Sequence, residues 1–313
     1  MRVRLRRWIG FARDAAATPA GKRIAALARL GVVALVIAFL VLRLNAVGWR
    51  ETLNALPESP WFYILFLGFY FSLPLFETAI YRRLWGLPWR ALPLFVRKRV
   101  LNEAFVEYSG DAYLFGWARN RIGRENSDIL HTVKDVAILS SIAGHLVTIA
   151  ALLLLVASGH LPALIAANPE AAPYLLAPGV IVAVVVIGLY SVRDRLFRMP
   201  ADVATTTLGL HLARQVTTLA FQVGMWAVAL PSAGWSAWLV LLAARTALSR
   251  VPLLPNKELM FAGLGVALSG VIAAPPERIA AMFVASGALV VGCHLLVFVL
   301  GLRGASRAVS PTA

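Results

Sequence analysis

Residues 135–157 read DVAILSSIAGHLVTIAALLLLVA, an almost wholly apolar stretch that is long enough to cross a bilayer as one helix. A hydrocarbon core of about 30 Å is spanned by about 20 apolar residues in a helix. Backbone amides in lipid need hydrogen-bond partners within the protein, and the alternating pattern of barrel strands is missing from this stretch. The segment therefore predicts a transmembrane α-helix.

Further apolar runs lie near 24–42, 60–80, 173–191, 206–230, 235–249, 258–274 and 279–302. Together with the first stretch they predict an all-α protein, a polytopic membrane bundle of about eight transmembrane helices. The composition agrees, because 60% of the 313 residues are apolar and only 14% are charged. A water-soluble domain of this size has more polar residues to cover its surface.

The positive charge of the chain follows the predicted spans. Its net charge of +15 would favour nucleic acid as the partner of a soluble protein, but the basic residues lie between apolar runs and at the termini. They cluster before the first run, within 81–134 and after the fourth run, whereas 158–172 contains no lysine or arginine. This distribution predicts a multi-pass inner-membrane protein with both termini cytoplasmic. No nucleic-acid-binding module is recognisable, so membrane lipids are the expected partners.

The expected organisation is a basic cytoplasmic segment at 1–23, one membrane domain at 24–302 and a cytoplasmic tail at 303–313. No HExxH motif, ligand cluster or nucleotide-binding loop occurs in the chain, so the sequence predicts no metal and no cofactor.

Two stretches interrupt the apolar pattern. In 91–118, apolar and charged residues alternate at helical spacing and Ser109-Gly110-Asp111 breaks the pattern, which predicts an interfacial or re-entrant helix pair over 88–120. A second interrupted stretch, 241–265, aligns with it so that Asp111 meets Glu258. Paired broken helices in two halves of a membrane protein indicate a substrate site between two pseudo-repeats. The alternative is two unrelated loops that contain turn residues.

Four short motifs resemble one family. They are LNAVGWRETLNAL at 44–56, AIYRRLW at 79–85, EYSGDAYLFGWARNRIGR at 107–124 and RVPLLPNKE at 250–258. The layout is similar to the flippase-like transmembrane region of bacterial lysylphosphatidylglycerol synthases and its stand-alone relatives, with Asp111 at the acidic position. Asn256-Lys257 replaces a glycine-rich run of that family, and the 107–124 motif lacks the usual proline. The resemblance implies broken-helix repeats and movement of a charged or glycosylated lipid between leaflets, without aminoacyl transfer.

The run at 206–230 contains polar residues at helical spacing on one face, which are Thr207, His211, Arg214, Gln215, Thr218 and Gln222. An arginine near mid-membrane costs about 2.5 to 3.5 kcal/mol on insertion scales, so Arg214 should face the bundle or a wet cavity. It binds either a lipid phosphate or a structural acid, Asp111 or Glu258. His211 and His145 form either a proton relay or neutral contacts between helices.

Other charges complete the candidate substrate site. Arg97, Arg99 and Arg119 belong to clusters, at 97–99 and 119–124, that are expected to meet anionic lipid at the cytoplasmic face. Arg245 and Arg250 either form a gate with Lys257 and Glu258 or are ordinary cytoplasmic charges. Glu77, at the end of the 60–80 run, is expected to be a solvated anchor.

These features predict a lipid translocator that moves a phospholipid or polyprenyl-linked headgroup, anionic or phosphate-bearing, with no catalytic residue. Two alternatives remain. One is an integral-membrane enzyme that modifies a headgroup with Asp111, Glu107 or His145 as general base. The other is a non-catalytic membrane partner of an envelope-lipid biosynthetic enzyme.

Overall fold

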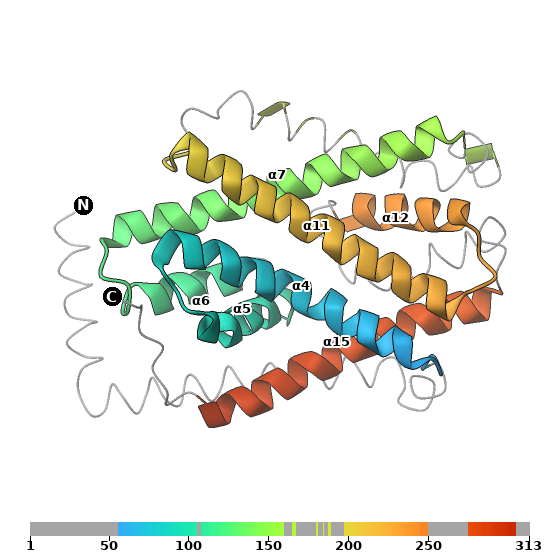
Figure 1. Cartoon of the computed structure of the whole chain (residues 1–313), viewed down its shortest axis with the longest axis horizontal. Coiled ribbons are helices and arrows are strands. Elements are labelled where there is room, and N and C mark those ends of the chain that lie inside the picture. Colours follow the sequence, from blue (N-terminus) through green and yellow to red (C-terminus); the bar gives the residue numbers. More distant parts are fainter. Residues whose placement is uncertain are drawn as a thin grey trace, which may run out of the picture.

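The computed structural model describes residues 56–104, 108–159, 197–249 and 275–304, with a few isolated residues between 165 and 188. Within these ranges all the regular secondary structure is helical, with no β-strand, which confirms the all-α class. Figure 1 shows how the helices are arranged. The α-helices are α4 (Pro60–Trp85), α5 (Leu92–Ala104), α6 (Ser109–Ala118), α7 (Asn126–Ala157), α11 (Ala201–Ala229), α12 (Trp235–Ser249) and α15 (Pro276–Gly304). A 3-10 turn, η1 (Trp89–Ala91), connects α4 to α5.

Three of the described helices are long and apolar enough to cross a membrane, namely α4, α7 and residues 278–297 of α15. At 1.5 Å per residue, α4 and α7 measure about 39 Å and about 48 Å. Helix α11 has 29 residues but carries the polar stripe, and α12 has only 15. The expected spans at 24–42 and 258–274 lie outside the described residues, as does nearly all of 173–191. The structure therefore does not confirm the count of about eight spans.

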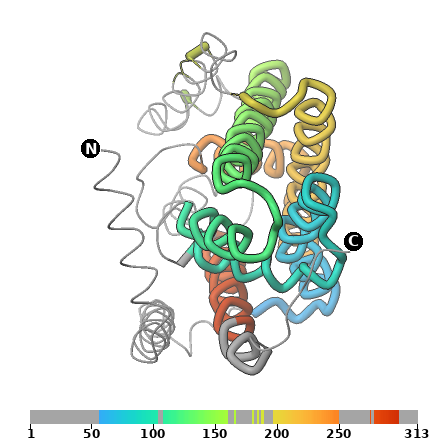
Figure 2. Tube along the Cα trace, turned by 90° about the vertical axis from the view of Figure 1, so that its left-hand side faces the viewer, coloured from blue at the N-terminus to red at the C-terminus, as the bar shows by residue number. Residues whose placement is uncertain are grey.

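Helix α11 lies along α4 and α7, and α12 packs against α7 and α11 (Figure 2). Glycines permit the close contact between α4 and α11. A Cβ added at Gly68 would lie 2.5 Å from the Phe221 ring, and one at Gly224 would lie 3.2 Å from Leu65. Small residues bring membrane helices together in this way, since lipid provides no hydrophobic force between them.

The region expected to hold a helix pair forms a helical hairpin, which we call the α5–α6 hairpin. Its helices measure only about 20 Å and about 15 Å, too short to cross a hydrocarbon core of about 30 Å. Both views place the hairpin between α7 and α15 (Figures 1 and 2), and it also packs on α4. The break lies earlier than expected, because Ser109-Gly110-Asp111 forms the first turn of α6. Tyr108, just before it, adopts a left-handed φ of 73°.

Asp135 joins α7 to the start of α11. Helix α7 begins at Asn126 and not at 135, so Asp135 lies within the helix and is buried. Its Oδ2 accepts hydrogen bonds from the backbone N–H groups of Arg198 and Met199, each at 2.9 Å. A carboxylate that accepts backbone N–H bonds is well stabilised. These contacts fix where α11, and therefore its polar stripe, begins.

Candidate functional site

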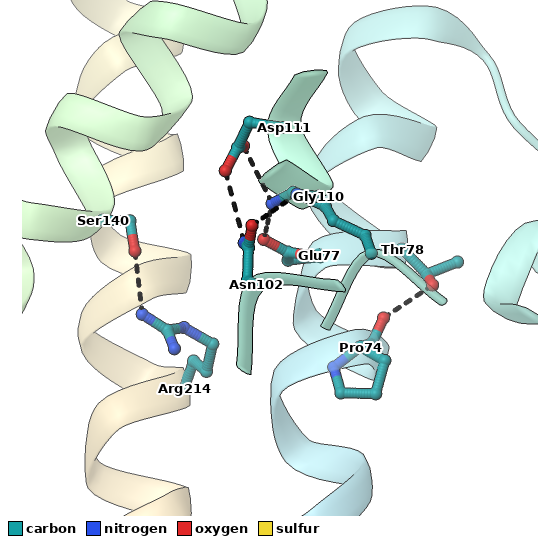
Figure 3. A network of polar contacts seen from close by, with 9 residues as sticks. Pro74, Glu77, Thr78, Asn102, Gly110, Asp111, Ser140 and Arg214 are labelled. Carbon is teal, nitrogen blue, oxygen red and sulfur yellow. Dashed lines mark hydrogen bonds and ion pairs between the residues drawn. The ribbon is translucent and has the colours of Figure 1, made fainter. Parts of the chain in front are cut away.

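Charged side chains from three helices meet inside the bundle, and Figure 3 labels two of them, Glu77 and Asp111. Lys98 of α5 lies between Glu77 of α4 and Asp111 of α6, and only 4% of its surface is exposed. Its Nζ forms an ion pair with Glu77 Oε1 and lies 3.2 Å from Asp111 Oδ1. A buried ammonium is strongly destabilising unless it is paired, and here two carboxylates compensate it. We call these residues the carboxylate–lysine cluster.

The α5–α6 hairpin has to be tight for Asp111 to reach Lys98. Gly110 provides the space, since a Cβ at this position would lie 2.1 Å from the Lys98 carbonyl oxygen. The Gly110 N–H donates to Asn102 Oδ1 at 2.6 Å, while Ser109 Oγ donates to the Leu101 carbonyl at 2.7 Å. Asn102 Nδ2 in turn donates to Asp111 Oδ2 at 3.3 Å. Asn102 therefore binds both the backbone and the acid of the first turn of α6.

Two expectations from the sequence are wrong here. Glu77 is not a solvated anchor, because α4 continues to Trp85 and α5 folds back over Glu77. Lys98 and Arg99 do not meet lipid at the surface either, because both side chains are buried and bind protein acceptors. Both errors have the same physical reason. The hairpin places Lys98 and Arg99 inside the bundle, where they pair with the carboxylates of Glu77, Asp111 and Glu103.

Arg99, the residue after Lys98, is buried and forms a second set of contacts on another face of α5. Pro74 of α4 has no N–H, so the Tyr70 carbonyl, four residues earlier, lacks its usual helical donor. Arg99 Nη1 donates to that carbonyl, and its guanidinium lies 4.4 Å from the centre of the Tyr70 ring. Arg99 Nε also donates to Glu103 Oε1 at 2.7 Å, and Glu103 Oε2 lies 3.3 Å from Nε2 of His294 on α15. These contacts connect α4, α5 and α15.

The polar stripe of α11 faces the bundle, as its spacing predicts. Thr207, His211, Arg214 and Gln222 are buried, with exposed fractions of 1% to 7%. Gln215 is half-buried. Arg214 Nη2 donates to Ser140 Oγ of α7 at 3.1 Å (Figure 3). Of the two acids considered as its partners, Asp111 contacts Lys98 and Asn102, and Glu258 lies outside the described residues.

His211 connects this stripe to the carboxylate–lysine cluster. It is 1% exposed, lies by the backbone of Val136, and is within electrostatic reach of both Arg214 and Lys98. His145 is also buried, and its Nδ1 lies 2.6 Å from the Ser141 carbonyl in its own helix. Because a carbonyl only accepts, Nδ1 carries the proton in that contact.

The remaining candidate cations lie elsewhere. Arg119 is exposed beyond the end of α6, as are Arg121 and Arg124. Arg97 and Arg245 are half-buried, in α5 and α12. Arg250 and Glu258 lie outside the described residues. The expected gate and the break of the second interrupted stretch involve these positions and therefore also lie outside the described residues. The structure therefore brings together Asp111, His211 and Arg214 but leaves Arg119 on the surface.

Sequence reasoning missed the partners of these charges. Glu77 and Lys98 were visible as charges beside an apolar run, but no local spacing connects residues 21 positions apart. The contact between Arg99 and Glu103 had a local signal, since opposite charges four residues apart share one helix face. The contact of His294 also had a signal in the sequence, because a histidine within an apolar run needs a polar partner.

No known family model matches the chain, and no curated protein or solved structure is significantly similar to it. A functional conclusion therefore depends on the buried charges.

Proposed function

We propose that the chain is a lipid translocator that moves a phospholipid or polyprenyl-linked lipid with an anionic, phosphate-bearing headgroup between leaflets. The observation that supports it most is the set of buried cations, Lys98 and Arg214, with His211 beside both. Ionisable groups inside membrane helices are expensive and usually mark the path of a polar substrate. A guanidinium also matches the geometry of a phosphate.

The α5–α6 hairpin supplies the route in this proposal. It enters from the end of α4 and returns to the start of α7 without the length to cross, as a re-entrant segment does. The headgroup moves between this hairpin and the polar stripe of α11. The second interrupted stretch, 241–265, serves as the counterpart in the other pseudo-repeat, with Glu258 in the role of Asp111.

The placement in the membrane is part of the same proposal. The chain lies in an inner membrane with both termini cytoplasmic, so the exposed Arg119, Arg121 and Arg124 meet anionic headgroups of the cytoplasmic leaflet. Each such cation contributes about 1 kcal/mol near the surface. The motif resemblance to the flippase-like region of lysylphosphatidylglycerol synthases supports translocation without aminoacyl transfer.

The test is transport by the purified chain in liposomes that contain fluorescent phosphatidylglycerol. Dithionite quenches only the outer leaflet, so translocation appears as fluorescence that becomes accessible with time. We expect Arg214→Ala to abolish this signal, because the variant loses the buried guanidinium. Arg83→Ala is the matched control, since Arg83 is exposed at the end of α4, and it should transport normally. Normal transport by a folded Arg214→Ala variant would remove Arg214 from the site.

A further inference from the structure

We infer that headgroup binding is coupled to proton uptake by Asp111, because the phosphate takes Lys98 away from that carboxylate. The inference rests on the proposed function and adds a second ligand, the proton, to the same site. One ion pair of Lys98 is exchanged for another. Lys98 Nζ leaves Asp111 Oδ1 for a phosphate oxygen, and a proton from water binds the released carboxylate.

Charge balance provides the first argument. The carboxylate–lysine cluster carries two negative charges and one positive charge, and Arg214 adds a second positive charge nearby. These four groups sum to zero. A phosphodiester headgroup adds one negative charge to a region of low dielectric, where an uncompensated charge is strongly unfavourable. Uptake of one proton restores neutrality. Arg99 has a separate carboxylate, Glu103, and does not enter this balance.

The geometry favours Asp111 over Glu77 as the carboxylate that loses its ion pair with Lys98. Lys98 Nζ pairs with Glu77 Oε1 and lies 3.2 Å from Asp111 Oδ1, so accessibility and position in the helices have to distinguish the two carboxylates. The Asp111 side chain is 15% exposed, against 10% for Glu77. Glu77 lies within the long helix α4, whereas Asp111 lies in the first turn of α6, directly after the break at Tyr108. Asp111 is therefore the more accessible partner, at the end of a short helix.

Other groups face the same region and have to be distinguished from Asp111. Tyr81 of α4 is buried within electrostatic reach of Glu77 and Asp111, but a phenol is already protonated at neutral pH. His211 of α11 is the other group that can take a proton. Helix α7 contributes the hydroxyl of Ser140 through Arg214. His294 of α15 faces Glu103, on a different set of contacts.

The experiment titrates the purified full chain in detergent with dihexanoylphosphatidylglycerol, a soluble lipid with one phosphodiester charge. A pH indicator in weakly buffered solution counts protons while calorimetry measures binding. We expect about one proton taken up per bound lipid, and a Kd that rises about tenfold for each unit of increasing pH, since proton uptake and affinity are linked. Asp111→Asn should lose both effects, because an amide cannot take the proton.

Glu103→Gln is the matched control, because it removes the other carboxylate of the α5–α6 hairpin that pairs with a buried cation, in this case Arg99. It should keep the proton uptake. Absence of lipid binding to the wild-type chain would overturn the proposed function itself. Binding without proton uptake would overturn the coupling alone. Proton uptake that persists in Asp111→Asn but is lost in His211→Gln would assign the proton to His211 and refute Asp111. If Asp111→Asn does not fold, the wild-type proton count and pH dependence test the coupling, and His211→Gln, which should keep the proton uptake, tests its assignment to Asp111.

Discussion

Lys98 shows most clearly how a single residue shapes this molecule. Its ammonium lies between carboxylates from two other helices, and all three side chains are largely removed from solvent. Removing one partner of a buried ion pair destabilises the folded state much more than replacing both partners with apolar residues, because the remaining charge stays buried without compensation. The carboxylate–lysine cluster should therefore stabilise the fold as a unit.

Lys98→Met is expected to destabilise the folded state by about 3 to 5 kcal/mol, because it leaves two buried carboxylates without their cation. Thermal unfolding of the purified protein in detergent measures this loss as a lower Tm. The double variant Glu77→Gln, Lys98→Met should recover part of it. Arg90→Met, at an exposed arginine of η1, serves as the control and should leave Tm nearly unchanged. A Tm equal to wild type in Lys98→Met would show that the cluster is not buried.

Pro74 and Arg99 should be energetically coupled through the Tyr70 carbonyl. Arg99→Met removes the donor of a carbonyl that Pro74 has deprived of its helical partner. In a Pro74→Ala background the helix supplies an N–H again, so the same substitution should cost about 1 kcal/mol less. A double-mutant cycle on the free energy of unfolding measures the difference. Additive effects would mean that Arg99 does not satisfy this carbonyl.

At the scale of the elements, periodicity alone predicted much of the helical structure. The apolar runs correspond to α4, α7, α12 and α15, with ends shifted by a few residues except at the start of α7, which begins at Asn126 and not at 135. The polar spacing of 206–230 also predicted correctly which face of α11 is buried, because helical geometry is local. Pairing between helices is not local. The contact of Glu77 with Lys98 depends on α5 folding back along α4, which no spacing in the sequence expresses.

The α5–α6 hairpin depends on Gly110 more than on any other glycine in the described ranges. Gly110→Ala places a Cβ against the Lys98 carbonyl, and the backbone must move to relieve the overlap. We expect a loss of about 2 kcal/mol or more, as overpacking of a well-packed core costs 1 to 3 kcal/mol. Tm and transport should both fall, since Asp111 moves away from Lys98.

Gly116→Ala is the matched control, because Gly116 lies on the same helix α6 and a Cβ there meets nothing within 4 Å. Alanine also favours a helix over glycine, so this variant should be as stable as the wild type or slightly more stable. Equal stability of the two variants would contradict the close approach of α5 and α6.

At the scale of the whole molecule, the described helices form a bundle that exposes large apolar side chains and buries several charged ones. Large apolar side chains are exposed on α4, α7, α11 and α15, among them Ile64, Leu153, Val216 and Leu296. A soluble protein would bury them, whereas lipid accommodates them. Of the buried cations, Arg214 lies on α11, whereas Lys98 and Arg99 lie on the short helix α5. A bundle that exposes apolar side chains and encloses charged ones is compatible with a membrane protein.

The most direct measurement compares the lipids of cells with and without this chain, both in total and in the outer leaflet with a membrane-impermeant label. Translocation predicts unchanged totals with one phosphate-bearing lipid depleted from the outer leaflet when the chain is missing. Disappearance of a lipid species with accumulation of its precursor would contradict that account, and would instead favour an enzyme that modifies a headgroup.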